Sequence, residues 1–108
     1  MPNEILTYQT PDGKIPLETY LDSLRDRRAK LSIARRIQQA AAGNFGDHHS
    51  LNNGLHEMRI DYGPGYRIYF GWHGQQIILL LLAGDKSTQQ ADIALARTYL
   101  ADFKERNP

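Results

Sequence analysis

Three cationic side chains fall in the part of the chain whose pattern predicts β-strands. Arg59 belongs to one alternating run, Arg67 belongs to the next, and Lys86 follows an apolar run soon afterwards. Residues an even number apart share one face of a strand, so Arg59 and Arg67 fall on the same face if their runs form a hairpin. Three cations gathered on a small sheet suit a phosphate-bearing ligand, and they make RNA the first candidate.

The register of this hairpin decides which side chain lies opposite Arg67. Residues 55–62 and 66–72 both alternate between apolar and polar side chains. Only a loop with an odd number of residues keeps apolar side chains opposite apolar ones, so we predict a three-residue loop at 63–65. The predicted pairs are Tyr62 with Tyr66, Ile60 with Ile68, Met58 with Phe70, Asp61 with Arg67, and Arg59 with Tyr69.

Each member of the cationic trio also has a purely structural interpretation. A cross-strand ion pair with Asp61 is a sufficient reason for Arg67, and such a pair would also hold a functional arginine in place when no RNA is bound. Tyr69 either packs across the strands against Arg59 or offers a surface on which an RNA base stacks. Lys86 is either a phosphate ligand or a solvated turn residue.

The side chains that would act as acid or base are less obvious. Arginine stays protonated and is a poor base. Glu57 and His73 share the arginine face and are the candidates that titrate in a useful range, whereas His56 shares the core face and is expected to be structural. His73 is also an RNA-binding candidate, together with Tyr69. His48 and His49 are adjacent, so their side chains diverge, and we expect no metal site there.

The densest cationic segment precedes the hairpin. Asp22 and Asp26 offset part of its charge, so it is either a solvated helix face or a contact surface for ribosomal RNA or an acidic partner segment. Arg35 and Arg36 are the RNA-binding candidates in this segment. Its cations are Arg25, Arg27, Arg28, Lys30, Arg35 and Arg36.

The whole-chain composition sets limits on function. With 108 residues we expect one domain, residues 1–108, and 13 Lys and Arg against 12 Asp and Glu leave a net charge of only +1. Any attraction for nucleic acid must therefore be local. The chain has no cysteine, which excludes disulfides and thiolate zinc sites. We expect no signal peptide and a cytoplasmic location, because the first residues lack an apolar segment and the apolar run 77–83 is too short for a membrane span.

The periodicity predicts an α+β fold with the order β-α-α-β-β-β-α and a mainly antiparallel sheet. A short strand at 5–8 is followed by two helices, one starting at Pro16 and one ending near Gly43, with a break near Asp26. Residues 44–54 are expected to be loop and 77–82 a central strand. Ser87 and Gln90 have the spacing of a capping box that opens the last helix.

This order of elements resembles the RelE/ParE superfamily of type II toxins. The resemblance is strongest to the HigB-like branch of addiction module killer proteins, and it covers about Ile15 to Phe103. Its most specific parts are the segments Gly63-Pro64-Gly65-Tyr66-Arg67 and Gly84-Asp85-Lys86-Ser87-Thr88-Gln89. It implies a small toxin held inactive by an antitoxin, usually a helix-turn-helix protein. RelE-like members cleave mRNA without a metal or other cofactor, often on the ribosome, and ParE-like members poison DNA gyrase.

The resemblance also implies roles for the cationic trio. Arg67 matches the arginine that engages the scissile phosphate, Arg59 matches a Lys or Arg of the preceding strand, and Lys86 matches the basic position after the last strand. RelE has a tyrosine shortly after that position, and residues 87–91 contain none. A second RelE lysine aligns with Glu57. These departures leave two alternatives to an mRNA endoribonuclease that inhibits translation, namely a ParE-like gyrase poison and a binding module that has lost toxicity.

Overall fold

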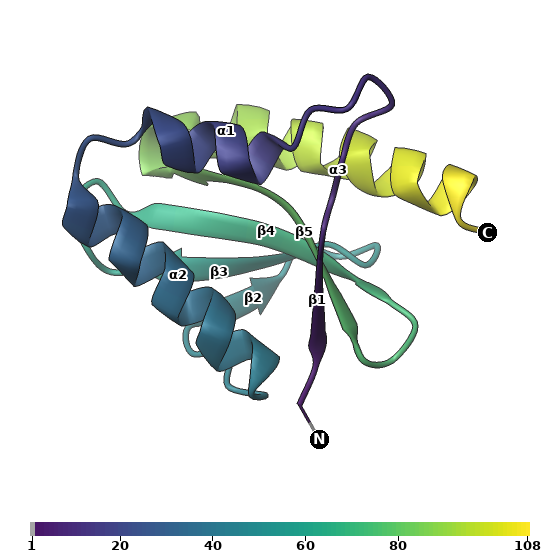
Figure 1. Ribbon diagram of the computed structural model, residues 1–108, viewed down its shortest axis with the longest axis horizontal. Coiled ribbons are helices and arrows are strands. Elements are labelled where there is room, and N and C mark those ends of the chain that lie inside the picture. Colours follow the sequence, from purple (N-terminus) through teal and green to yellow (C-terminus); the bar gives the residue numbers. More distant parts are fainter. Residues whose placement is uncertain (1) are drawn as a thin grey trace.

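One five-stranded sheet with helices on both of its faces forms the framework of the protein (Figure 1). The computed structural model describes residues 2–108, and its α+β architecture with a C-terminal helix confirms the predicted fold class. The elements are β1 (Glu4–Thr7), α1 (Pro16–Ser23), α2 (Arg27–Ala41), β2 (His48–Ser50), β3 (His56–Ile60), β4 (Tyr66–His73), β5 (Ile77–Asp85), the 3₁₀ turn η1 (Lys86–Thr88) and α3 (Gln89–Arg106).

The sheet is mainly antiparallel, as the alternation and the turns predict. Its strand order is β1-β5-β4-β3-β2, and only β1, which pairs with β5, runs parallel to its neighbour. An irregularity in the β4–β5 pairing lies between Tyr69 and Phe70. As a result Leu81 and Leu82, although adjacent, both pack in the same cluster beneath α3.

The two N-terminal helices begin where their sequence signals predict. Pro16 occupies the first turn of α1, where its missing N–H costs nothing. The carboxylate of Asp26 caps α2 by accepting from the backbone N–H groups of Arg28 at 2.9 Å and Ala29 at 3.4 Å. The break near Asp26 is therefore confirmed.

Both faces of the sheet are buried. Helices α1 and α2 cover one face, where Ile33 packs with Met58 and Ile68. Helix α3 covers the other face, where Ala96 and Leu100 pack in a second cluster. The arginine face of β3 and β4, which the alternation alone would leave open to solvent, thus lies beneath or beside α3.

The observed register of the β3–β4 hairpin differs from the predicted register by two residues. Ile60 pairs with Tyr66, so the loop comprises the five residues 61–65. The predicted odd parity holds, but Asp61 does not lie opposite Arg67. The observed pairs are His56 with Phe70, Glu57 with Tyr69, Met58 with Ile68, Arg59 with Arg67, and Ile60 with Tyr66.

Two further predictions about local structure are wrong. Residues His48–Ser50, predicted as loop, form the edge strand β2 by pairing with β3. The expected capping box does not form either. Instead the carboxylate of Asp85 accepts hydrogen bonds from the backbone N–H of Ser87 at 2.8 Å and from its hydroxyl at 2.5 Å, and α3 starts at Gln89.

Candidate functional site

The structure brings the three predicted cations together around one hollow. This hollow has a volume of about 300 Å³ and lies where the β3–β4 loop meets η1. Arg59 and Arg67 are direct cross-strand partners, and Lys86 reaches the hollow from η1. The residues that line it are Asp47, Arg59, Ile60, Asp61, Gly65, Tyr66, Arg67 and Lys86.

A buried carboxylate holds the two arginines. Glu57 is fully buried, and its Oε1 accepts hydrogen bonds from Nε of Arg59 at 2.7 Å and from Nη1 of Arg67 at 3.4 Å. The partner of Arg67 is thus Glu57 on the same face of β3, and the predicted pair with Asp61 does not form. The hydrogen bond to Glu57 is also the main reason that the pKa of Arg59 is raised.

The two arginines differ in how open they are to solvent. The side chain of Arg59 is 42% exposed, whereas that of Arg67 is only 9% exposed. Within residues 2–108, the Nε of Arg67 is buried and has no hydrogen-bond partner. A buried donor of this kind carries a desolvation cost, so the protein satisfies the Arg67 guanidinium only in part.

Helix α3 contributes a residue that the sequence analysis did not assign to the site. Gln89 donates from Nε2 to Oε2 of Glu57 at 2.9 Å, so both oxygens of the buried carboxylate are fixed. This bond ties the start of α3, and with it Lys86, to the arginine strands. Gln89 closes the Gly84–Gln89 segment that carries the family resemblance, and this was the only signal in the sequence that pointed to it.

Carboxylates balance the positive charge of the site. Glu57 lies beneath the two arginines, and Asp47 and Asp61 lie on the rim, so three acids accompany the three cations. Oδ1 of Asp47 contacts Nε2 of His49 at 3.0 Å, whereas Asp61 is exposed. Attraction of an anion must therefore come from local geometry rather than from excess charge.

Two predicted RNA-binding residues do not fit that role in this structure. Tyr69 is fully buried beneath α3, so no base can stack on its ring, and burial raises the pKa of its hydroxyl. His73 lies six residues beyond Arg67 on the same strand, about 20 Å away at the usual rise per residue. Its ring packs edge-on against Phe103 near the far end of α3.

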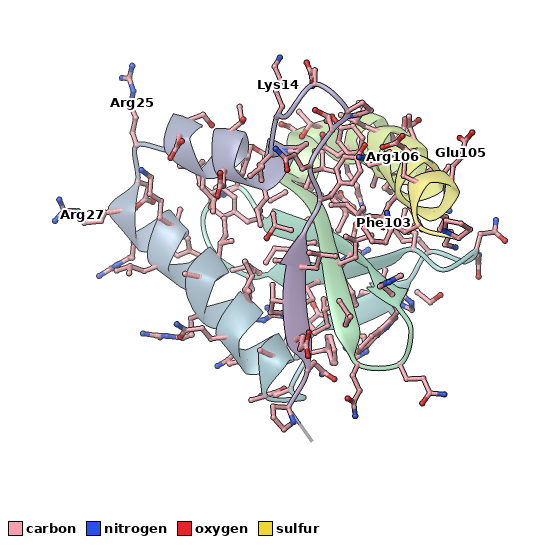
Figure 2. All side chains as sticks on the ribbon, turned by 45° about the vertical axis from the view of Figure 1, so that its right-hand side comes forward. Lys14, Arg25, Arg27, Phe103, Glu105 and Arg106 are labelled. Carbon is pink, nitrogen blue, oxygen red and sulfur yellow. The ribbon has the colours of Figure 1, made fainter. Side chains whose placement is uncertain are left out.

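Arg35 and Arg36 are adjacent but have different environments. Arg36 donates to the backbone carbonyls of Arg59, Phe45 and Asp47, so it fastens α2 to the end of β3 and to the loop before β2. These contacts give Arg36 a structural role, and its RNA binding stays a prediction. Arg35 is exposed on α2. Arg25, in the connection before α2, and Arg27, at its first residue, are also exposed, and their side chains project outward in Figure 2.

Three histidines lie on β2 and β3, and among residues 2–108 they are not part of a cluster that could hold a metal ion. His56 stacks on Phe70 with ring centroids 5.2 Å apart, and burial lowers its pKa. This packing fits the prediction that His56 is a structural residue on the core face. His48 and His49 lie on the exposed edge strand, and no group of three metal-ligating side chains occurs among residues 2–108.

The arrangement places the cationic hydrogen-bond donors beside two exposed carboxylates, those of Asp47 and Asp61. The two acid or base candidates predicted from the sequence are not accessible beside them. Glu57 is too buried to reach a substrate hydroxyl, and His73 lies at the other end of its strand. The hollow is therefore suited to binding an anion such as a phosphate and to stabilising added negative charge on it.

Comparison with known proteins identifies a relative. A Haemophilus influenzae protein is 43% identical to this chain over 83 residues, which cover 77% of this chain and 84% of that protein. The two proteins belong to one family. The relative is described as an uncharacterized protein, so the kinship carries no activity across. None of the family models searched matches the chain.

The helices were compared with the length and hydrophobicity that a membrane span requires. Among the described residues no helix is both long enough and apolar enough to cross a membrane.

Proposed function

We propose that this protein is an RNA-cleaving toxin of the RelE/HigB type, which acts on mRNA in the cytoplasm and inhibits translation. A cognate antitoxin, a helix-turn-helix protein in this branch of the superfamily, would keep it inactive. The observation that carries the proposal is the convergence of Arg59, Arg67 and Lys86 on one hollow of about 300 Å³. The sequence resemblance matches Arg67 to the arginine that engages the scissile phosphate, and it matches Arg59 and Lys86 to basic positions of the family.

The chemistry follows from what the hollow offers. When the 2′-hydroxyl of RNA attacks the adjacent phosphorus, a P–O2′ bond forms, the P–O5′ bond breaks, and the phosphate gains negative charge in the transition state. Guanidinium and ammonium groups stabilise that charge. The 2′-hydroxyl loses a proton and the 5′-oxygen gains one. Water, the ribosome or the carboxylates of Asp47 and Asp61, which line the hollow, would exchange these protons.

Glu57 acts as a positioning residue in this proposal. Its Oε1 orients both arginines, and Gln89 fixes its Oε2. A bound phosphate would offer oxygens to the remaining donors of Arg59 and Arg67 without displacing Glu57. Catalysis would then rest on orienting the RNA and on electrostatic stabilisation.

Expression of the chain alone in cells tests the proposal. We expect growth arrest and new mRNA ends that depend on ribosomes, and at least about a hundredfold less cleavage by Arg67→Ala. Lys104→Ala is the matched control, because Lys104 is exposed near the other end of α3. Circular dichroism establishes that each variant is folded.

Two outcomes would contradict the proposal. Intact mRNA together with gyrase-linked DNA damage would favour a ParE-like poison. No effect on growth by the folded chain would favour a binding module without toxicity.

A further inference from the structure

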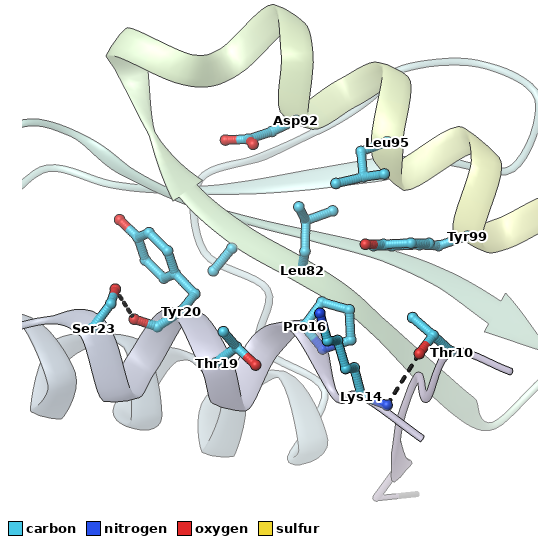
Figure 3. Close-up of a pocket in the computed structure, with 11 residues that line it drawn as sticks. Thr10, Lys14, Pro16, Thr19, Tyr20, Ser23, Leu82, Asp92, Leu95 and Tyr99 are labelled. Carbon is cyan, nitrogen blue, oxygen red and sulfur yellow. Dashed lines mark hydrogen bonds between the residues drawn. The ribbon is translucent and has the colours of Figure 1, made fainter. Parts of the chain in front are cut away.

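A second hollow, larger and more apolar than the first, lies between α1 and α3 above β5 (Figure 3). Its volume is about 400 Å³. Leu82 of β5 forms its floor, and Tyr20 of α1 and Leu95 and Tyr99 of α3 line its sides. We call this hollow the α1–α3 groove.

Apolar side chains in the α1–α3 groove remain available to a ligand. Leu95 is 40% exposed, which makes it one of three large hydrophobic residues that the described chain leaves open to solvent. It faces the same space as Leu82 and the ring of Tyr99. Covering this surface with an apolar side chain would remove it from water and favour a complex.

The end of the groove nearest η1 is electronegative. Asp92 accepts a hydrogen bond from the Thr88 hydroxyl at 2.6 Å, and Asp85 accepts from Ser87. Among the described residues no Lys, Arg or His lies within 4.0 Å of either carboxylate. Burial is the main cause that raises the pKa of Tyr20 to about 12, and the charges of Asp85 and Asp92 raise it further.

The carboxylate of Asp92 lies close to the backbone of β5. A Cβ at Gly84 would lie 1.9 Å from Oδ2 of Asp92, so the carboxylate packs directly against the glycine backbone. Only glycine permits this approach. Lys14 lines the same groove, so its walls carry both signs of charge.

We propose that the α1–α3 groove receives a short segment of a partner protein in which an apolar side chain stands beside a Lys or Arg. The apolar side chain would cover Leu82 and Leu95, and the cation would pair with Asp92. Charge complementarity selects this occupant, because Asp92 has no Lys, Arg or His within 4.0 Å among the described residues and lines the same groove as the apolar Leu82 and Leu95.

A second copy of the chain is the main alternative occupant. Its α2 carries Leu31, which is 62% exposed, among several exposed arginines. Such a contact would join two different surfaces, so it would be made twice in a two-fold dimer or would repeat from copy to copy in a ring or filament. The groove, with a volume of about 400 Å³, has room for one or two side chains. A stable interface between two copies would have to bury roughly 800 Å² per partner, most of it outside the groove.

Peptide selection tests the proposal with defined probes. A phage-displayed library of random peptides is selected on the wild-type chain and depleted on Leu95→Asp. We expect the retained peptides to combine Lys or Arg with Leu, Ile or an aromatic residue. Fluorescence anisotropy then measures binding of the best peptide without RNA, so the result does not depend on the proposed RNA cleavage.

Variants of the chain locate the binding site. We expect Leu95→Asp to weaken binding at least about tenfold and Asp92→Asn about fivefold, with a smaller effect of Asp92→Asn at high salt. Leu31→Asp and Glu105→Gln are the matched controls on exposed positions elsewhere, and they should leave the affinity unchanged.

Three results would overturn the proposal. The first is a set of retained peptides that is acidic or has no basic residues. The second is binding that Leu95→Asp and Asp92→Asn leave unchanged. The third is light scattering that shows concentration-dependent assembly of the chain alone, abolished by either Leu31→Asp or Leu95→Asp, which would identify a second copy as the occupant.

Discussion

Arg67 and Arg36 are both partly or wholly buried arginines near the same end of β3, yet their partners differ in kind. Arg36 donates to three backbone carbonyls, those of Arg59, Phe45 and Asp47. Arg67 shares the Glu57 carboxylate with Arg59 and borders the hollow. In both arginines the Nε is buried without a partner among residues 2–108, so that feature alone does not separate them.

The difference lies in what a ligand can reach. The donors of Arg36 are committed to fixed, neutral backbone groups that close a loop. Arg67 instead lines a hollow that two further cations also line. Residue type and burial are therefore not sufficient to identify an arginine as a candidate phosphate ligand. Its position beside a hollow is also needed. The variants below test this distinction, from the largest expected effect to the smallest.

Removing the shared carboxylate should have the largest effect on stability. Glu57→Ala leaves Arg67 buried without a counter-charge, and we expect the free energy of unfolding to fall by about 3–5 kcal/mol. Urea denaturation measures the loss. Glu57→Gln keeps the shape and one hydrogen-bond acceptor, so its cost should be smaller. A loss below about 1 kcal/mol in Glu57→Ala would show that Glu57 does not hold the arginines.

Removing Arg36 should destabilise the fold while sparing the site. Arg36→Ala loses the bonds to three carbonyls, and we expect a cost of about 2–3 kcal/mol in the free energy of unfolding. The adjacent Arg35→Ala is the matched control, since Arg35 is exposed and should change stability by less than about 0.5 kcal/mol. If folded Arg36→Ala lost RNA binding as completely as Arg67→Ala, the distinction between the two arginines would fail.

Removing a rim acid should have the smallest effect, and it should be a gain. Asp61→Asn takes away a negative charge that lines the hollow, so RNA affinity should rise about two- to fivefold at low salt and less at high salt. Asp22→Asn, an exposed acid on α1, controls for a general change in net charge. Equal gains in the two variants would show that Asp61 has no special position.

Much of the framework follows from local signals in the sequence. Pro16 and Asp26 mark the starts of the two helices, and the apolar run at Ile77 marks the central strand. The parity of the hairpin places Arg59 and Arg67 on one face, since both registers share that parity. The α+β fold is therefore readable from propensity, capping and alternation.

The features that the sequence analysis predicted wrongly or missed depend on tertiary contacts. Parity cannot distinguish a three-residue loop from a five-residue loop. The register differs by two residues from the predicted one, so Arg59 instead of Asp61 lies opposite Arg67. The apolar stripe of α3 does not say which face of the sheet it covers, and this cover buries Tyr69. The bond from Gln89 to Glu57 spans 32 residues, and no spacing rule predicts it.

The salt dependence of RNA binding tests the central claim most directly. A single-stranded RNA with 2′-O-methyl riboses cannot be cleaved, so its affinity for the purified chain reports binding alone. Removal of one phosphate contact should reduce the slope of log K against log salt by about 0.7. We predict this reduction for Arg59→Gln, Arg67→Gln and Lys86→Gln and an unchanged slope for Lys104→Gln. Equal slopes for all four variants and the wild type would contradict the account.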